Sequence, residues 1–257
     1  MSIIRLAARV ALRQALLAGQ TLAEDRVYDS AITEIDLAAV EERKPLLIVT
    51  TDDVEGEVVG RDILNSEPTL DIVVETACAA PAVLEDGAQT LVIPDTDAGY
   101  EVSLDIVCRQ VIRVIQAGGG EWGDVFRDLV PSFTHHLQRR GADNRNGVKF
   151  AARQIVVTAK LLAEPLDPPE EDTPLGRFLT MAEDNPKLAP LVPIIRSQFG
   201  SGPQTSWDDL RTALGLSMGE YALMAVAPSF GPETPGFDIE GAPATGGEAA
   251  LPPEDGP

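Results

Sequence analysis

The stretch LDIVVETAC, residues 70–78, decides the fold because its side chains divide between two faces. One face is formed by Leu70, Ile72, Val74, Thr76 and Cys78. The residues between them, two of which are acidic, form the other face, since successive side chains of a strand point in opposite directions. The pattern predicts a β-strand with one face in a hydrophobic core.

A second strand is predicted upstream of this one. Pro45 introduces the run LLIVTT, residues 46–51, whose apolar and β-branched residues are typical of a buried strand. We expect it to end in an acidic turn, which is made by Asp52, Asp53, Glu55 and Glu57. Alternation along this segment would gather several of the carboxylates on one side.

An amphipathic helix is predicted over residues 3–17, where apolar residues recur at helical spacing. Its polar stripe is basic, because Arg5, Arg9 and Arg13 follow each other at every fourth position. Gly19 is the expected stop. No long apolar segment opens the chain, so neither a signal peptide nor a membrane-spanning helix is expected.

Two more helices are predicted after the strands. Apolar residues over 104–115 and again over 122–137 recur at spacings of three and four. Thr96 or Asp97 is the expected cap of the first of them, and the glycines 118–120 should end it.

A long strand should follow these helices. Residues 148–161 alternate but change phase once, which predicts a β-bulge near Arg153 or Gln154. With the strands at 46–51 and 70–78, the expected fold class is α+β, with helices packed on a mainly antiparallel sheet. This domain should span residues 1–165.

The remainder of the chain has a different composition. Residues 166–173 are rich in proline and acid and predict an extended linker. Residues 174–227 predict a helical extension, in which Ser206 and Asp209 match a capping box. Residues 228–257 hold six acidic residues and no Lys or Arg, a composition typical of a disordered tail.

The overall charge narrows the classes of function. The 257-residue chain has a formal charge of −21, and 44% of its residues are hydrophobic. That composition supports a sizeable core but argues against wrapping nucleic acid, which needs clustered Lys and Arg. An acidic surface would instead let DNA slide past without sticking, although on charge alone simple solubility is the preferred explanation.

The candidate chemical groups are few. The acidic turn could hold a hard cation, but its spacing is not that of an EF-hand, and a solvated edge or a partner-facing row of charge fits it better. His135 and His136 are adjacent in a predicted helix, so they would point about 100° apart and could not share a metal without other ligands. Cys78 and Cys108 have no metal-site spacing, and a disulfide between them stays open.

No catalytic motif is present in the sequence. The glycines 118–120 lack the lysine and hydroxyl signature of a phosphate loop, and no nucleophile elbow occurs. We therefore expect a protein that is not an enzyme and has no catalytic residue, resident metal or cofactor.

The order of these elements resembles that of tail terminator proteins of long-tailed, siphovirus-like phages. The resemblance covers residues 1 to about 165. The stretches that carry it are LAARVALRQALL at 6–17, RVYDS at 26–30, PLLIVTTDD at 45–53, RG at 140–141 and GVKFAARQI at 147–155. The last ninety or so residues have no counterpart in the family, and we expect residues 174–226 to decorate the ring or brace the neck.

The resemblance implies a structural role in the virion, assembled in the host cytoplasm. The protein would form a homo-hexameric ring on the tail tube, stop tube growth and receive the head-completion or neck proteins on its other face. DNA would pass through the lumen without specific binding, and no membrane would be involved. The mechanism would be surface complementarity around a six-fold axis rather than bond chemistry.

Opposite charges on neighbouring subunits would set the register of such a ring. The predicted interface residues are Asp52, Asp53, Glu55, Glu57, Arg140, Arg145 and Arg153. Solvent-facing charge is the alternative for all seven. Three other identities stay open: another phage neck or tail-completion protein, a metal-dependent enzyme built on the acidic turn, and a bacterial adaptor unrelated to phages.

Overall fold

The computed structural model describes residues 2–30, 45–58, 67–78, 80–83, 89–92, 98–141, 144–145, 148–149 and 151–200, with Ser206, Asp209 and Thr212. Within 78–100 and 141–151 it describes the backbone alone. The helices are α1 (Ile3–Ala18), α3 (Ala98–Ala117), α4 (Glu121–Leu129), α5 (Pro174–Glu183), the 3-10 turn η1 (Ala189–Leu191) and α6 (Val192–Arg196). The strands are β1 (Val27–Asp29), β2 (Leu46–Glu55), β3 (Thr69–Cys78), β4 (Ala80–Val83), β5 (Gln89–Val92), β6 (Ser132–Gly141), β7 (Asn144–Arg145), β8 (Val148–Lys149) and β9 (Ala151–Lys160).

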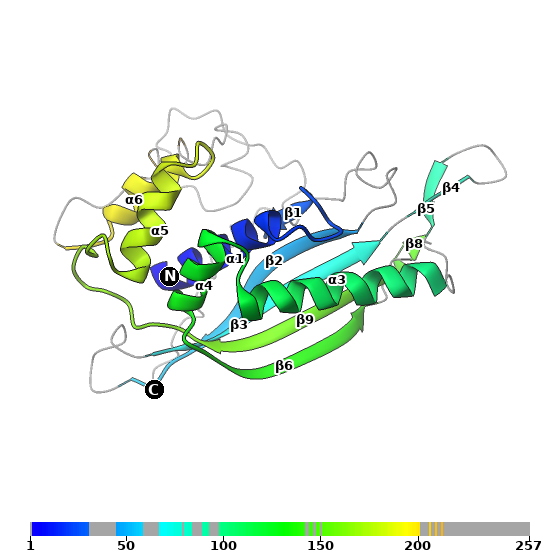
Figure 1. Cartoon of the computed structure of the whole chain (residues 1–257), viewed down its shortest axis with the longest axis horizontal. Coiled ribbons are helices and arrows are strands. Elements are labelled where there is room, and N and C mark those ends of the chain that lie inside the picture. The colour runs from blue at the N-terminus through cyan, green and yellow to red at the C-terminus, as the bar shows by residue number, and fades with distance from the viewer. Residues whose placement is uncertain are drawn as a thin grey trace, which may run out of the picture. The chain divides into compact units, whose positions relative to one another are not determined.

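A five-stranded sheet in the order β1-β2-β3-β9-β6 organises the described part of the chain. β1 is parallel to β2, and the other three neighbouring pairs are antiparallel. The helices α1, α3 and α4 lie on one side of this sheet (Figure 1). The fold class is therefore α+β, with helices on a mainly antiparallel sheet, as the sequence predicted.

The alternation that predicted β3 is confirmed by its burial. The side chains of Leu70, Ile72, Val74 and Thr76 are all buried on the face that meets the helices. Glu75, on the opposite face, is exposed, whereas Val73 on that face is buried. The core face continues into β2 and β9, which add Leu47, Val49, Ile155 and Val157.

The predicted N-terminal helix is α1, and polar groups hold its first turn. The Ser2 hydroxyl accepts a hydrogen bond from the Arg5 amide at 2.9 Å. The Glu164 carboxylate accepts hydrogen bonds from the amides of Ile3 and Ile4 at 3.0 and 3.1 Å. These contacts satisfy N–H groups that a helix leaves unpaired at its start, and they fix the segment that follows β9 to the start of α1.

The basic stripe of α1 faces the two strands at this edge of the sheet. Arg5 donates to the Thr51 hydroxyl at 2.8 Å, and Arg13 donates to the Val27 carbonyl at 3.0 Å. Arg9 forms an ion pair of 2.7 Å with Asp29. The arginines therefore attach the helix to β1 and β2, a role that its polar stripe alone did not indicate.

The turn between α3 and α4 lies close against α1. Gly118 and Gly120 have positive φ angles of 79° and 76°, and they end α3 as predicted. A Cβ atom on Gly119 would lie 2.5 Å from the Ala15 carbonyl oxygen, so only glycine permits this approach. The caps expected for α3 at Thr96 or Asp97 lie outside the described residues.

The predicted helix over 122–137 is wrong in its second half. α4 ends at Leu129, and β6 begins at Ser132. Pro131 causes the change, because proline disfavours helical geometry in the residue before it and cannot donate a backbone hydrogen bond. Val130 accordingly has φ −121° and ψ 83°.

Two local predictions about strands also require correction. β2 does not end before the acidic residues but continues to Glu55, with a register shift between Thr51 and Val54. No register shift interrupts β9 near Arg153, since its pairs with β3 and β6 run on through this residue. The change of phase in the sequence instead reflects the boundary between β8 and β9, which belong to different sheets.

The described helices after the linker pack on the main domain. The Thr173 hydroxyl accepts a hydrogen bond from Gly176 at 3.1 Å and so caps α5. Leu175 and Phe178 are buried in the same core as α1 and α4, and the Phe178 ring meets Trp122 edge to face at 6.0 Å. Deleting residues 174–226 would therefore uncover that core.

The capping box predicted further along the chain is confirmed. The Ser206 amide donates to the Asp209 carboxylate at 3.1 Å, and the Asp209 amide donates to the Ser206 hydroxyl at 3.2 Å. The Ser206 hydrogen bonds lower the pKa of Asp209. The tail predicted to be disordered, residues 228–257, lies outside the described residues.

Candidate functional site

The acidic residues predicted as an interface are all exposed at one end of β2. Asp52, Asp53, Glu55 and Glu57 form this acidic segment. The register shift places Asp52 and Asp53 together opposite Asp71 of β3, an arrangement that defines a β-bulge. A bulge turns side chains away from the regular pleat, so the segment presents its carboxylates to solvent rather than to the core.

The outer edge of β2 is covered along only part of its length. β1 pairs with Leu47 through Val49, and the Ser30 amide then donates to the Val49 carbonyl at 3.0 Å. Among the described residues, no strand pairs with this edge from Thr50 to Glu55. In the described part of the chain, the acidic segment thus coincides with a strand edge that has no outer strand.

A metal site is the alternative prediction for these carboxylates. Within the described ranges, no group of three or more His, Cys, Asp or Glu side chains is placed to hold a metal ion. Within those ranges, the carboxylates of the acidic segment do not gather into a metal-binding cluster. They form a row of charge along a strand edge.

The predicted basic residues lie at the opposite end of the sheet. Arg153 of β9 forms ion pairs with Glu101 at 2.7 Å and with Asp105 at 2.8 Å, both from α3. The hydrogen bond that Arg153 donates to Glu101, helped by the charge of Asp105, raises the pKa of Arg153. With only 25% of its side chain exposed, Arg153 joins α3 to the sheet within the subunit.

Arg140 differs from Arg153 in its exposure. It also contacts Glu101, at 3.0 Å, but 69% of its side chain is exposed. An ion pair so exposed to solvent contributes little to the stability of the subunit itself. Arg140 is therefore available to a partner, whereas the third predicted basic residue, Arg145, lies on β7, where the backbone alone is described.

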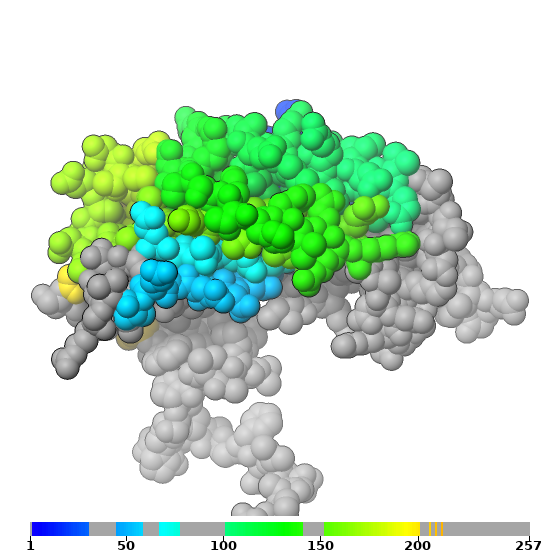
Figure 2. Space-filling model, turned by 90° about the horizontal axis from the view of Figure 1, so that it is seen from below, coloured from blue at the N-terminus to red at the C-terminus, as the bar shows by residue number. Residues whose placement is uncertain are grey.

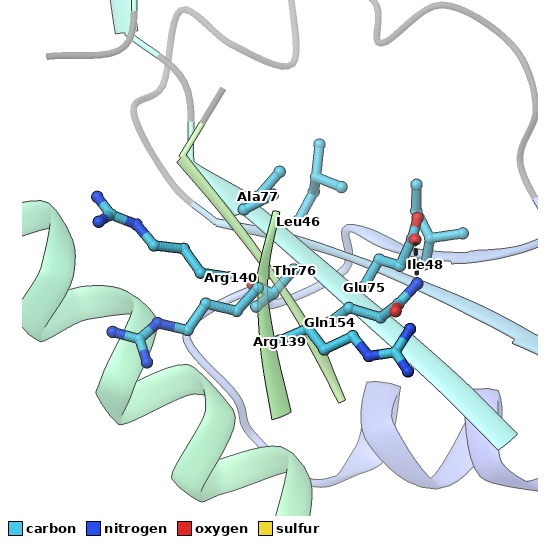
Figure 3. Close-up of a pocket in the computed structure, with 10 residues that line it drawn as sticks. Leu46, Ile48, Glu75, Thr76, Ala77, Arg139, Arg140 and Gln154 are labelled. Atoms are coloured by element: carbon cyan, nitrogen blue, oxygen red, sulfur yellow. Dashed lines mark hydrogen bonds between the residues drawn. The ribbon is translucent and has the colours of Figure 1, made fainter. Parts of the chain in front are cut away.

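A shallow pocket of about 370 Å³ lies beside these arginines. Leu46, Ile48, Arg139 and Gln154 are among the residues that line it. Figure 3 shows the neighbours Arg139 and Arg140 extending to opposite sides of β6, as adjacent strand residues do. The Gln154 amide donates to Glu75 at 2.9 Å on the floor of the pocket.

His135 and His136 lie on β6, not on the predicted helix. Both side chains are exposed, and the ring of His136 lies 3.3 Å from the Gln138 amide nitrogen. Adjacent strand residues point to opposite faces, so the two imidazoles diverge even further than they would in a helix. This geometry gives them no shared ligand.

Cys108 is a free thiol buried in the core face of α3. Burial raises its pKa, an effect that the nearby positive charge of Arg153 opposes. A neutral buried thiol behaves as a small apolar side chain. Because Cys108 is free and Cys78 is the chain's other cysteine, the disulfide that the sequence left open is not formed in this structure.

Arg139 and the β6 edge are the features that the sequence interpretation missed. The spacing predicts helix for the first part of β6, because exposed residues on both of its faces give no hydrophobic period that would mark a strand. Pro131 was the available signal, because it makes a helix through residues 129–137 improbable.

Comparison with known proteins adds no relative. No family model matches the chain, and no curated protein is significantly similar to it in sequence. Among the helices of the described residues, none is both long and apolar enough to span a membrane.

Proposed function

We propose that this protein is a tail terminator of a long-tailed phage. In this role it is a structural virion protein that closes into a hexameric ring on the tail tube, stops tube growth and joins the tail to the neck. Its partners are the tube protein on one face and a head-completion protein on the other, and DNA passes through the lumen. The role depends on surface complementarity and needs no cofactor.

One observation carries the proposal beyond the order of elements. The exposed acidic segment lies at one end of the sheet, and the exposed Arg140 lies at the other. Along the strands, Arg140 is level with Thr76, five residues from the level of Asp52 and Asp53 and seven from that of Glu55, or roughly 17–24 Å. Charges that far apart cannot pair within one subunit, but they suit head-to-tail contacts, which generate rings when the rotation closes.

The test is native mass spectrometry of the purified full chain, with negative-stain images of the same sample. We expect a hexamer and six-fold rings, either alone or after addition of tail tubes. A monomer that also leaves tube ends unoccupied in the images would overturn the proposal. Binding to the portal side in place of the tube end would instead identify another neck or tail-completion protein.

A further inference from the structure

β6 forms one edge of the sheet and is open along its length. It has ten residues, and among the described residues it pairs only with β9. All of its described side chains are exposed except that of Leu137, which is partly buried. Figure 2 shows the green segment that includes β6 at the surface turned to the viewer. A strand edge of this kind presents unpaired N–H and C=O groups that can accept another strand.

The opposite edge of the same sheet is open only beyond β1. There the described residues Thr50–Glu55 of β2 have no outer strand. Among the described residues, the sheet thus has two stretches of strand edge with no outer strand, on opposite sides. On the β2 side, the Thr51 carbonyl accepts a hydrogen bond from the Arg5 guanidinium, a side chain rather than a strand. Such stretches favour aggregation unless charge, bulges or a specific partner limits them.

The charges of the two edges are opposite. β6 contains Arg139 and Arg140 and no acidic residue. Residues 50–57, the end of β2 and the two residues that follow it, contain four acidic residues and no basic one. Two β6 edges would repel each other, as would two β2 edges, whereas one edge of each kind would attract. Charge therefore selects a head-to-tail contact between copies.

The directions of the strands agree with such a contact. β2, β3, β9 and β6 alternate in direction across the sheet. When a second copy is rotated about an axis roughly parallel to the strands, its β2 runs antiparallel to β6 of the first. The two sheets can then join by an ordinary antiparallel ladder.

β1 determines how far the two strands can overlap. Within one subunit, Gly141 at the end of β6 lies level with Leu46 of β2. β1 occupies the edge of β2 as far as Val49. The β6 of a neighbour must therefore shift by about four residues, roughly 13 Å, before it clears β1. Strand stagger of this kind accompanies the tilt of strands around a closed ring.

The shift also aligns the charges. With Gly141 beside Thr50 of the neighbour, Arg139 and Arg140 lie alongside the bulge that holds Asp52 and Asp53. We infer that the subunits join by strand addition, in which the end of β6 of one copy pairs with residues 50–55 of β2 in a second copy. This inference rests on the proposed ring and names the contact that closes it.

Matched charge reversals test the inference in the full chain. R139E/R140E reverses the β6 edge, and D52K/D53K reverses the acidic segment. Each variant alone should weaken association by at least about 100-fold, because like charges then face each other. In an equimolar mixture the native contact and the doubly reversed contact can alternate around the ring, so the mixture should form rings although neither variant does so alone. A chain that carries all four substitutions should form rings again.

The controls distinguish variants that do not fold from variants that fold but do not assemble. R113E and E170K/D172K change equally exposed charges away from both edges and should leave the rings intact. R139E alone leaves the Arg140–Glu101 ion pair in place and should still weaken the ring. Circular dichroism and the midpoint of thermal unfolding identify any variant that does not fold.

Hydrogen exchange on the wild-type ring provides a second measurement. Alternate amides near the end of β6 and over residues 50–55 should be protected in the ring compared with the dissociated subunit. Rings that form normally from R139E/R140E or D52K/D53K, or that show no such protection, would overturn the inference and leave the terminator proposal standing. A wild-type chain that neither forms rings nor occupies tube ends would contradict the proposed function itself. If β6 is found paired with a strand of a different protein, that result would also overturn the inference.

Discussion

The two edges of the central sheet are built differently. β1 has three residues, and two arginines of α1 hold it, through Asp29 and through the Val27 carbonyl. β6 has ten residues, and the described ion pair that ties it to a helix is the exposed one between Arg140 and Glu101. One edge is thus stabilised by the subunit's own helix, and the other presents its backbone and side chains outward. The part of the first edge that β1 covers therefore contributes to folding, whereas β6 and the described part of β2 beyond β1 are the stretches that the proposed contact uses.

Removal of apolar side chains should give the largest difference in unfolding free energy between the two sides of the sheet. Leu47, on β2 beneath α1, is fully buried, whereas Leu137 on β6 is only partly buried. Leu47→Ala should lower the free energy of unfolding by about 2–5 kcal/mol, through lost contacts and a residual cavity. Leu137→Ala should lower it by less than about 1 kcal/mol. Urea unfolding measures both, and equal losses would contradict the distinction between the edges.

Removal of arginines should give the next largest difference. Arg13→Ala leaves the Val27 carbonyl without its donor and should cost about 1 kcal/mol of unfolding free energy. Arg9→Ala should cost a similar or smaller amount, which salt should reduce because an ion pair is lost. Arg139→Ala should change stability by no more than about 0.5 kcal/mol, since its side chain is exposed. A large loss for Arg139→Ala would show that β6 is held by contacts within the subunit.

Replacement of one carboxylate on α3 should then test whether the attachment of α3 to the sheet is independent of α1 and β1. Glu101→Gln removes the charge that both Arg140 and Arg153 contact, and it leaves α1 and β1 untouched. We expect a loss of about 1 kcal/mol and faster hydrogen exchange in β6 and β9. Faster exchange in β1 as well would indicate that the two edges are coupled.

The smallest expected effect concerns the pH dependence of α3. Because burial raises the pKa of Cys108 in the folded protein, the folded state holds this proton more tightly than the unfolded chain does. The stabilising contribution is complete below the unfolded pKa near 9 and declines as the pH rises above it. Unfolding measured from pH 8 to 10 should therefore show a shallower decline for Cys108→Ala than for the wild type. Parallel curves would contradict a shifted thiol.

Parts of the fold could be predicted because one face of each element is buried. The alternation in residues 70–78 identified β3, and the spacing over 3–17 identified α1. β6 escaped because both of its faces are largely exposed, so no hydrophobic period marks it. Pro131 alone carried the information that the helix must end.

For the candidate site, too, the sequence predicted local features but not contacts between distant residues. The acidic residues were expected to be exposed, and all four are. Arg153 was assigned to the interface, but it pairs with Glu101, which lies 52 residues away in the chain. Pairing between distant residues depends on which helix crosses which strand, and no local pattern records that crossing.

The sequence by itself determined the α+β class, the position of α1 and β3, the stop at the glycines after α3 and the strong negative charge. Local periodicity and backbone preference suffice for these features, since each depends on neighbouring residues. Only the tertiary structure decided that β1 ends at Asp29, so that within the described ranges no outer strand pairs with the second half of β2, and that β6 forms the other edge. Strand order and register follow from contacts across the whole chain, which is why the two complementary edges became visible only in the folded molecule.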